Sequence, residues 1–158
     1  MVNRIARYEP DFPLPEYAYV PGINTRPTTS LEGESPARLL RVGVDLFHHG
    51  FYWEAHEAWE ACWIAAGRRG AKGDLLRGLI HLAASGVKAR QGSQHGVQTH
   101  AEKTCLAWSE LSEDLDLASL SELTEQVRKV CQTPKRFLCD SQENVVVVFD
   151  IRIELARG

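Results

Sequence analysis

The chain has 158 residues, with ordinary apolar and charged fractions of 44% and 25%, and a formal net charge of −3. These values fit one globular domain with a sizeable core, and the slight acidic excess argues against a nucleic-acid-binding surface, which would need a basic surplus. No apolar run approaches the length of a membrane span, and the N-terminus lacks the order of a signal peptide. We therefore expect a soluble cytoplasmic protein with neither a nucleic acid nor a membrane as partner.

Residues 1–34 are predicted to be irregular. Five prolines in this stretch forbid a long helix. Its aromatic residues, Tyr8, Phe12, Tyr17 and Tyr19, make it too apolar for a disordered tail. We expect an extended strap that wraps the rest of the chain, and we consider it as a lid over the site described below.

A first helix is predicted from Ser35 to the histidine pair His48 and His49. Ser35 is a natural N-cap, Pro36 suits the first helical position, and Gly50 suits the residue after the helix. The two histidines have two interpretations. They either favour the helix dipole in the last turn, or one of them points across the turn toward the next helix.

A second helix is predicted from Phe51 to Ala66, because apolar residues recur there with a helical period. Its core-facing arc is Tyr52, Ala55, Trp59, Cys62, Trp63 and Ala66. Glu54 falls on the opposite side, with Ala58, and is expected to be solvated. His56 lies at the flank of the arc and Glu60 follows one turn later, so an imidazole and a carboxylate share a semi-buried edge beside tryptophans.

The pair formed by His56 and Glu60 has two interpretations. A buried charge is costly unless it is paired or bound. The two side chains either bond each other and fix the helix to its neighbour, or reach into a cleft toward a metal, a water or a substrate.

A third helix is predicted from Asp74 to about Gln91, after a flexible basic loop at residues 67–73. Leucines dominate its buried face, whereas Arg77 and His81 lie on a polar face. The short loop makes this helix an antiparallel neighbour of the second one. His81 could therefore approach His56 and Glu60, although simple exposure to solvent also fits its position.

Two further helices are predicted at residues 93–111 and 119–132, with Ser93 as a cap and Pro134 as a stop. After them, residues 144–155 become β-branched and then alternate between apolar and charged, which is typical of a half-buried strand. Such a strand needs a partner, either the segment around Tyr17 or the same strand of a second copy in a homodimer.

The predicted fold class is all-α. A compact bundle of about five helices occupies residues 35–133. The proline-rich strap of residues 1–34 precedes it, and a tail at residues 134–158 with one short β-strand packs on the same domain.

The second and third helices carry motifs that resemble the domain-of-unknown-function family 309, a family of small all-helical proteins. Its hallmark is a glycine, an aromatic residue, the run EAHE and then WE and a tryptophan, which stand here as residues 50–63. A second motif is similar to residues 76–84, with His81 in place of the usual glutamine. The resemblance covers about residues 36–112 and implies fold more than function. Members of this family are sometimes labelled predicted metal-dependent hydrolases.

Two functions follow from these residues. The first is a metal or small-molecule site between the second and third helices, with hydrolase-like activity. Its candidate catalytic residues are His56, Glu57 and Glu60; its candidate ligand-binding residues are Tyr52, Trp59, Trp63, Arg77 and His81; its candidate metal ligands are His56, Glu60 and His81, for zinc, manganese or iron. The alternative is a non-catalytic interaction module in which the histidine, glutamate and tryptophan residues only hold the helices together.

Overall fold

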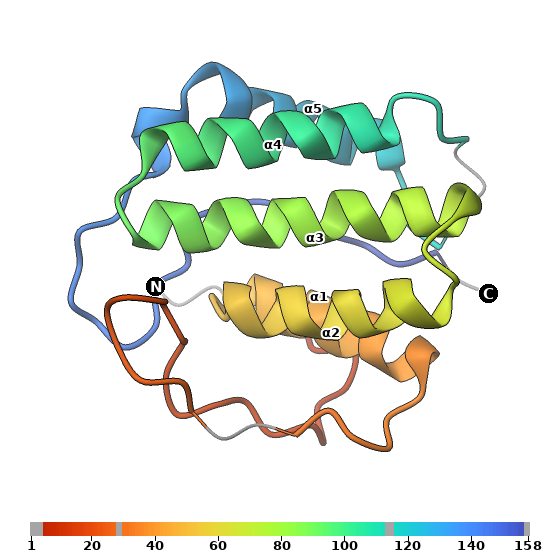
Figure 1. Cartoon of the computed structure of the whole chain (residues 1–158), viewed down its shortest axis with the longest axis horizontal. Coiled ribbons are helices and arrows are strands. Elements are labelled where there is room, and N and C mark those ends of the chain that lie inside the picture. Colours follow the sequence, from red (N-terminus) through yellow and green to blue (C-terminus); the bar gives the residue numbers. More distant parts are fainter. Residues whose placement is uncertain (1–4, 28–29, 113–115, 157–158) are drawn as a thin grey trace.

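In the computed structural model, which describes residues 5–27, 30–112 and 116–156, five α-helices stack in chain order (Figure 1). They are α1 (Pro36–His48), α2 (Tyr52–Ala65), α3 (Gly70–Arg90), α4 (Gln94–Trp108) and α5 (Leu120–Gln132), followed by the 3₁₀ turn η1 (Pro134–Phe137). α3 runs through the middle of the bundle, with α1 and α2 on one side and α4 and α5 on the other (Figure 1). The predicted all-helical bundle is confirmed, and none of these helices is long and apolar enough to cross a membrane.

The helix ends mostly follow the predicted caps. The Ser35 hydroxyl accepts the backbone N–H of Arg38 at 3.2 Å, and the Ser93 hydroxyl accepts that of Gly96 at 3.1 Å. α3 differs, because it begins at Gly70 rather than at Asp74. The chain reverses at Gly67 and Arg68, both with positive φ, so the glycine-rich residues after them are free to form the first helical turn.

A tryptophan of α2 lies directly on a glycine of α1. A Cβ added to Gly43 would fall 2.2 Å from the Trp59 indole nitrogen, so only glycine leaves room for the ring. The Trp59 N–H donates to the carbonyl of Leu40 at 3.2 Å, and the side chain is completely buried. This contact both packs the two helices and satisfies the polar atom of the indole.

The same arrangement recurs between α3 and α4. A Cβ on Gly78 would fall 2.0 Å from the Trp108 indole nitrogen, and the Trp108 N–H donates to the carbonyl of Leu75 at 3.0 Å. The buried Thr104 hydroxyl donates to the carbonyl of Gly78 at 2.8 Å. Two tryptophans thus join neighbouring helices through a glycine and a backbone carbonyl.

The N-terminal strap covers the outer side of α2, where the sequence predicts solvent. Glu54 is only 4% exposed and Ala58 is fully buried, so the prediction of a solvated Glu54 is wrong. The Glu54 carboxylate accepts the backbone N–H of Tyr19 at 3.0 Å, which fixes the strap against the helix. A helical wheel of α2 alone could not reveal a cover supplied by another segment.

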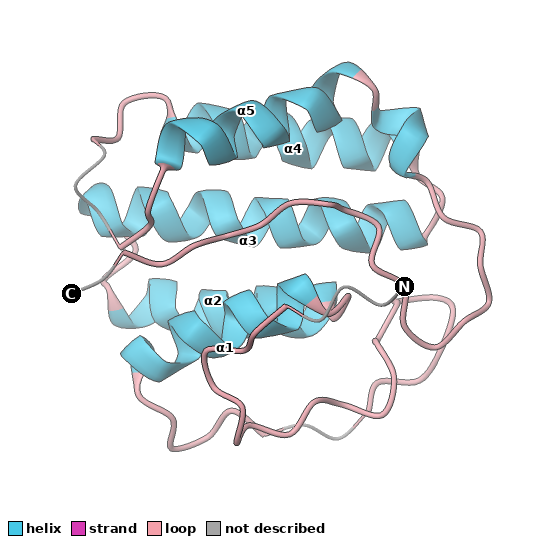
Figure 2. Cartoon of the chain, turned by 180° about the vertical axis from the view of Figure 1, so that it is seen from behind, coloured by secondary structure: helices cyan, strands magenta, loops and turns pink. Residues whose placement is uncertain are grey.

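The C-terminal tail alternates as predicted but is not a strand. Its buried residues are Phe149, Ile151 and Ile153, and its exposed residues are Asp150, Arg152 and Glu154. Within the described residues, its only β-type pairing is an isolated antiparallel bridge between Leu117 and Leu155, so the predicted strand over residues 144–155 is wrong. Figure 2 shows the tail as a loop that crosses α3 between the two helix pairs.

Side chains of the helices take the place of a neighbouring strand. The Tyr52 hydroxyl accepts the backbone N–H groups of Val148 at 2.9 Å and Phe149 at 3.3 Å. His48 Nε2 accepts the N–H of Ile153 at 2.9 Å. His48 is therefore a buried acceptor for the tail, a role that neither sequence interpretation of the histidine pair contained. Because these amides are already bonded, the tail does not require a β-strand partner at these positions.

Candidate ligand-binding site

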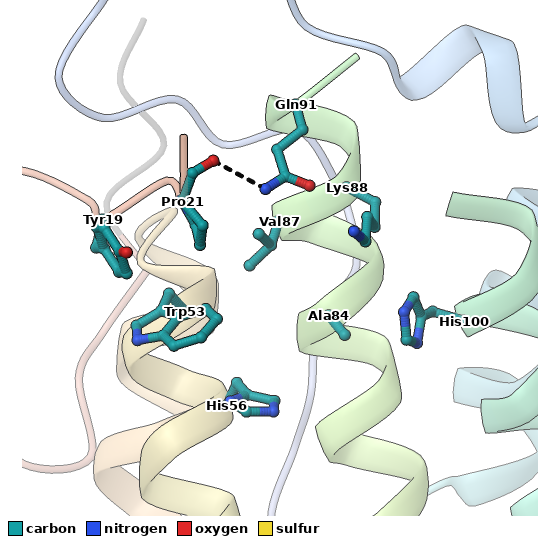
Figure 3. A pocket seen from close by; sticks show the side chains of 9 residues that line it. All are labelled: Tyr19, Pro21, Trp53, His56, Ala84, Val87, Lys88, Gln91 and His100. Carbon is teal, nitrogen blue, oxygen red and sulfur yellow. Dashed lines mark hydrogen bonds between the residues drawn. The ribbon is translucent and has the colours of Figure 1, made fainter. Parts of the chain in front are cut away.

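A cavity of about 320 Å³ lies between α2, α3, α4 and the N-terminal strap. Its lining combines apolar and polar side chains: Tyr19, Pro21, Trp53, His56, Ala84, Val87, Lys88, Gln91 and His100. Figure 3 shows His56 of α2 and His100 of α4 pointing toward each other across Ala84 of α3. The small side chain of Ala84 leaves space on the surface of α3, and the helices on either side supply the walls.

The strap closes one edge of this cavity. The Gln91 side-chain amide donates to the carbonyl of Pro21 at 3.0 Å (Figure 3), and the ring of Tyr19 meets Trp53 edge-on with centroids 5.2 Å apart. Burial raises the pKa of Glu54, and the bonded N–H of Tyr19 opposes that shift. The predicted lid thus has fixed contacts with both α2 and α3.

His56 is half-buried in the cavity wall. Its Nε2 lies 3.5 Å from a Glu60 carboxylate oxygen, and its ring lies 5.3 Å from Trp53 between centroids. Burial lowers the pKa of His56, whereas the nearby Glu60 and Glu57 carboxylates raise it. The Nδ1 atom is covered by protein and has no hydrogen-bond partner among the described residues. The imidazole is therefore neutral near pH 7 and has an unused nitrogen.

His81 and His100 form a hydrogen-bonded pair across α3 and α4. Their Nδ1 atoms are 3.0 Å apart while the ring centroids are 5.3 Å apart, so the rings meet edge to edge through these nitrogens. One nitrogen must carry the proton and the other must accept it. Burial, followed by the neighbouring His100, lowers the pKa of His81 to about 4. At neutral pH both rings are uncharged, and His100 faces the cavity with its tautomer linked to that of His81 through this bond.

The family comparison agrees with the position of this site in the chain. The family model described as Domain of unknown function (DUF309) matches residues 40–99. Over these residues the chain is similar to the DUF309 family. A comparison with curated proteins gives no match. Most of the cavity lining falls inside the DUF309 match, whereas the strap residues and His100 lie outside it.

Several DUF309 motif residues lie in the core instead of the cavity. Tyr52 and Trp59, predicted to contact a ligand, are 2% and 0% exposed and contact the tail and α1. Trp63 is half-buried under the guanidinium of Arg68, whose carbon is 5.5 Å from the ring centroid. The helical period of α2 turns Tyr52 toward the tail and Trp59 toward α1, and none of the three rings lines the cavity.

The other predicted site residues also have partners elsewhere. Glu57 forms an ion pair with Arg26 of the strap. Arg77 is exposed and pairs with Asp74 at 3.0 Å along α3. Glu60 is exposed and reaches the site only through its contact with His56. Of the predicted catalytic and ligand-binding residues, His56 alone lines the cavity.

The residues predicted to hold a metal do not converge on one point. His56 is directed to Glu60, and His81 is directed to His100. In the part of the chain that the structure describes, no three His, Cys, Asp or Glu side chains are grouped closely enough to hold a metal ion. This donor set does not fit a zinc, manganese or iron site, which needs at least three protein ligands in most proteins. The divalent metal stays a prediction, which metal analysis of the wild type and His56→Ala would test.

Most of the cavity wall is formed by residues that the sequence patterns do not single out. Trp53 and Gln91 lie on predicted helices but outside the apolar arcs that drew attention, and Lys88 looks like an ordinary surface residue. His100 could have been found from one signal. The helices that meet at Gly92 run antiparallel, so residues at similar distances from that turn, such as His81 and His100, face each other.

Proposed function

We propose that this protein binds a small organic molecule in the cavity between α2, α3, α4 and the strap. The observation that supports this most is the wall itself. It is mostly apolar, with a few polar groups that converge from different segments, as in typical ligand sites. Its volume lies at the lower end of the range of about 300–1,000 Å³ for such sites, which favours a small ligand.

The alternative, in which His56 only holds helices together, has weaker support. The contact between His56 and Glu60 is 3.5 Å long, and the two side chains are 24% and 48% exposed. Because the imidazole is neutral near pH 7, this contact is not an ion pair there, and even exposed ion pairs contribute only about 0–1 kcal/mol to stability. The helices are instead joined by buried, fully bonded groups such as Trp59 and Trp108. His56 is therefore not required to hold the helices together.

The proposal is limited to binding. Hydrolysis would in addition need a general base that reaches its proton. His56 is the residue of the wall best suited to act as a general base, because its lowered pKa keeps it neutral and Glu60 can orient it. A base must reach the proton that it removes. The His56 Nδ1 atom is covered by protein in this state, so catalysis would require the ring or the strap to move.

A fragment screen by saturation-transfer NMR tests the proposal. We expect several small aromatic fragments to bind the wild type, and Ala84→Phe to abolish this binding because the new ring fills the cavity. Ala65→Phe, at an exposed alanine at the end of α2, is the matched control and should bind normally. The proposal fails if no fragment binds at millimolar concentration, or if the bound fragments are insensitive to Ala84→Phe.

A further inference from the structure

Within the part of the chain that the structure describes, the side chains that line the cavity include a positive charge and no negative one. Among the described residues that line it, none carries a carboxylate, and Lys88 supplies a formal positive charge. Some other basic residues have a carboxylate partner, such as Lys72, which pairs with Asp116 at 2.8 Å. Within the described residues, Lys88 has no carboxylate within 4.0 Å. A half-buried ammonium without a counter-charge attracts an anion.

The stem of Lys88 is held in place by α4. A Cβ added to Gly96 would fall 2.7 Å from both Cγ and Cδ of Lys88, so the lysine stem lies on the surface that this glycine leaves bare. This packing directs the side chain along the α3–α4 boundary, beside His100. The charge of Lys88 also acts on His100. Burial lowers the pKa of His100 most, and the charges of Lys103 and Lys88 lower it further.

In one of the two tautomeric arrangements of the histidine pair, His100 adds a neutral donor beside this charge, and a bound carboxylate would favour that arrangement. Its Nδ1 is engaged by His81, and its Nε2 has no hydrogen-bond partner among the described residues. When the Nδ1–H of His81 donates to His100, the His100 Nε2 must carry the remaining proton. The polar end of the cavity can therefore offer an ammonium and an N–H, which suit a carboxylate, while Trp53 and Val87 offer apolar surface.

From this one-sided charge we infer that the ligand is a small organic monoanion, a carboxylate attached to a flat apolar body. The inference rests on the proposed function and specifies the chemical class of its ligand. The carboxylate binds at Lys88 and His100, and the apolar body packs against Trp53, Tyr19 and Val87. A neutral ligand of the same shape would leave the lysine charge without a partner.

Isothermal titration calorimetry with matched acids and amides tests this inference. The probes are phenylacetate and indole-3-acetate, each compared with its neutral amide, on the wild type, Lys88→Met and Lys129→Met. We expect the better acid to bind the wild type at least about tenfold more tightly than its amide, because charged hydrogen bonds are about twice as strong as neutral ones. Lys88→Met should remove this preference while changing amide binding less than about twofold. Lys129→Met, at an exposed lysine of α5, should retain it.

The outcomes separate the two proposals. If amides bind as tightly as acids and Ala84→Phe removes both, the cavity is a binding site but the anion inference is wrong. The inference is also wrong if Lys88→Met retains the preference for acids. If neither acids nor amides bind, the inference is overturned, and the fragment screen with Ala84→Phe then decides whether the binding function itself survives.

Discussion

Two tryptophans of α2 show how the same residue type serves two different regions. Trp59 is fully buried, sits on Gly43 and donates its N–H to a carbonyl of α1. Trp53 is half-buried, lines the cavity, and its N–H has no partner in the described part of the chain. The indole N–H of Trp59 is therefore satisfied inside the core, whereas the indole N–H of Trp53 is buried in the cavity wall without a partner among the described residues. The position of each ring in the core or in a cavity wall, rather than the residue type, therefore decides which tryptophan can belong to the candidate site.

We expect the largest loss of stability from a substitution that crowds the buried contact between α1 and Trp59. Gly43→Ala places a methyl group against the Trp59 ring, and we expect it to lower the free energy of unfolding by about 3 kcal/mol. Urea denaturation measures this. Gly96→Ala is the control, because the added Cβ meets only the flexible stem of Lys88 and the Ser93 hydroxyl, and its stability should stay within about 1 kcal/mol of the wild type. Equal losses in both variants would contradict the account of the core.

Acid should lower the stability of the folded state through the buried His48. Burial, then the charges of His49 and Arg152, lowers the pKa of His48 from 6.5 to about 4. Above pH 6.5 the ring is neutral in both the folded and the unfolded chain, so it has no effect on stability there. Between pH 6.5 and 4 only the unfolded chain gains the proton, so the folded state loses stability, on the order of 3 kcal/mol by pH 4.

Acid unfolding of His48→Gln checks this prediction. Glutamine does not titrate and its oxygen can still accept the N–H of Ile153, so the acid midpoint should move to lower pH. His95→Gln, at an exposed histidine at the start of α4, should leave the midpoint unchanged. A His48→Gln midpoint at the wild-type pH would show that His48 is not the group that titrates.

The tail anchor should give the next largest effect. Tyr52→Phe removes the hydroxyl that accepts two tail amides, and we expect a loss of about 2 kcal/mol because these buried groups become unsatisfied. Burial raises the pKa of Tyr52 to about 12, so this loss should not change near neutral pH. Tyr17→Phe, at a hydroxyl bonded in an exposed loop, should cost little by comparison in the same denaturation experiment. If Tyr52→Phe leaves the free energy of unfolding unchanged, the tail is held by its apolar residues alone.

The smallest stability effect is expected on the cavity side. His56→Ala should change the free energy of unfolding by less than about 1 kcal/mol, because the contact with Glu60 is long and partly exposed. Differential scanning calorimetry would check this beside the Gly43→Ala variant. A loss comparable to that of Gly43→Ala would revive the interpretation of His56 as a structural residue.

The helices could be predicted from local signals, because Ser35, Ser93, Gly50 and Pro134 act within one turn of themselves. The site could not, because its wall combines a strap, two central helices and His100 from a fourth segment. The motif on α2 directed attention to Tyr52 and Trp59, which the packing places in the core.

The tail shows the same limit of local reasoning. The alternation of apolar and charged residues correctly predicts which tail side chains are buried. It does not reveal what bonds the backbone, because a tyrosine and a histidine from distant helices act as acceptors in place of a strand. A period-2 pattern reports burial on one face and not the presence of a sheet.

The central claim is that the cavity beside Trp53 binds a small ligand while the other tryptophans are structural. The most direct test is a ¹⁵N–¹H NMR titration of the four tryptophan indole N–H signals with the small aromatic fragments of the screen. The account predicts a saturable shift of the Trp53 signal, with the signals of Trp59 and Trp108 unmoved. Shifts confined to Trp59 or Trp108, or no saturable shift of any indole signal, would contradict it.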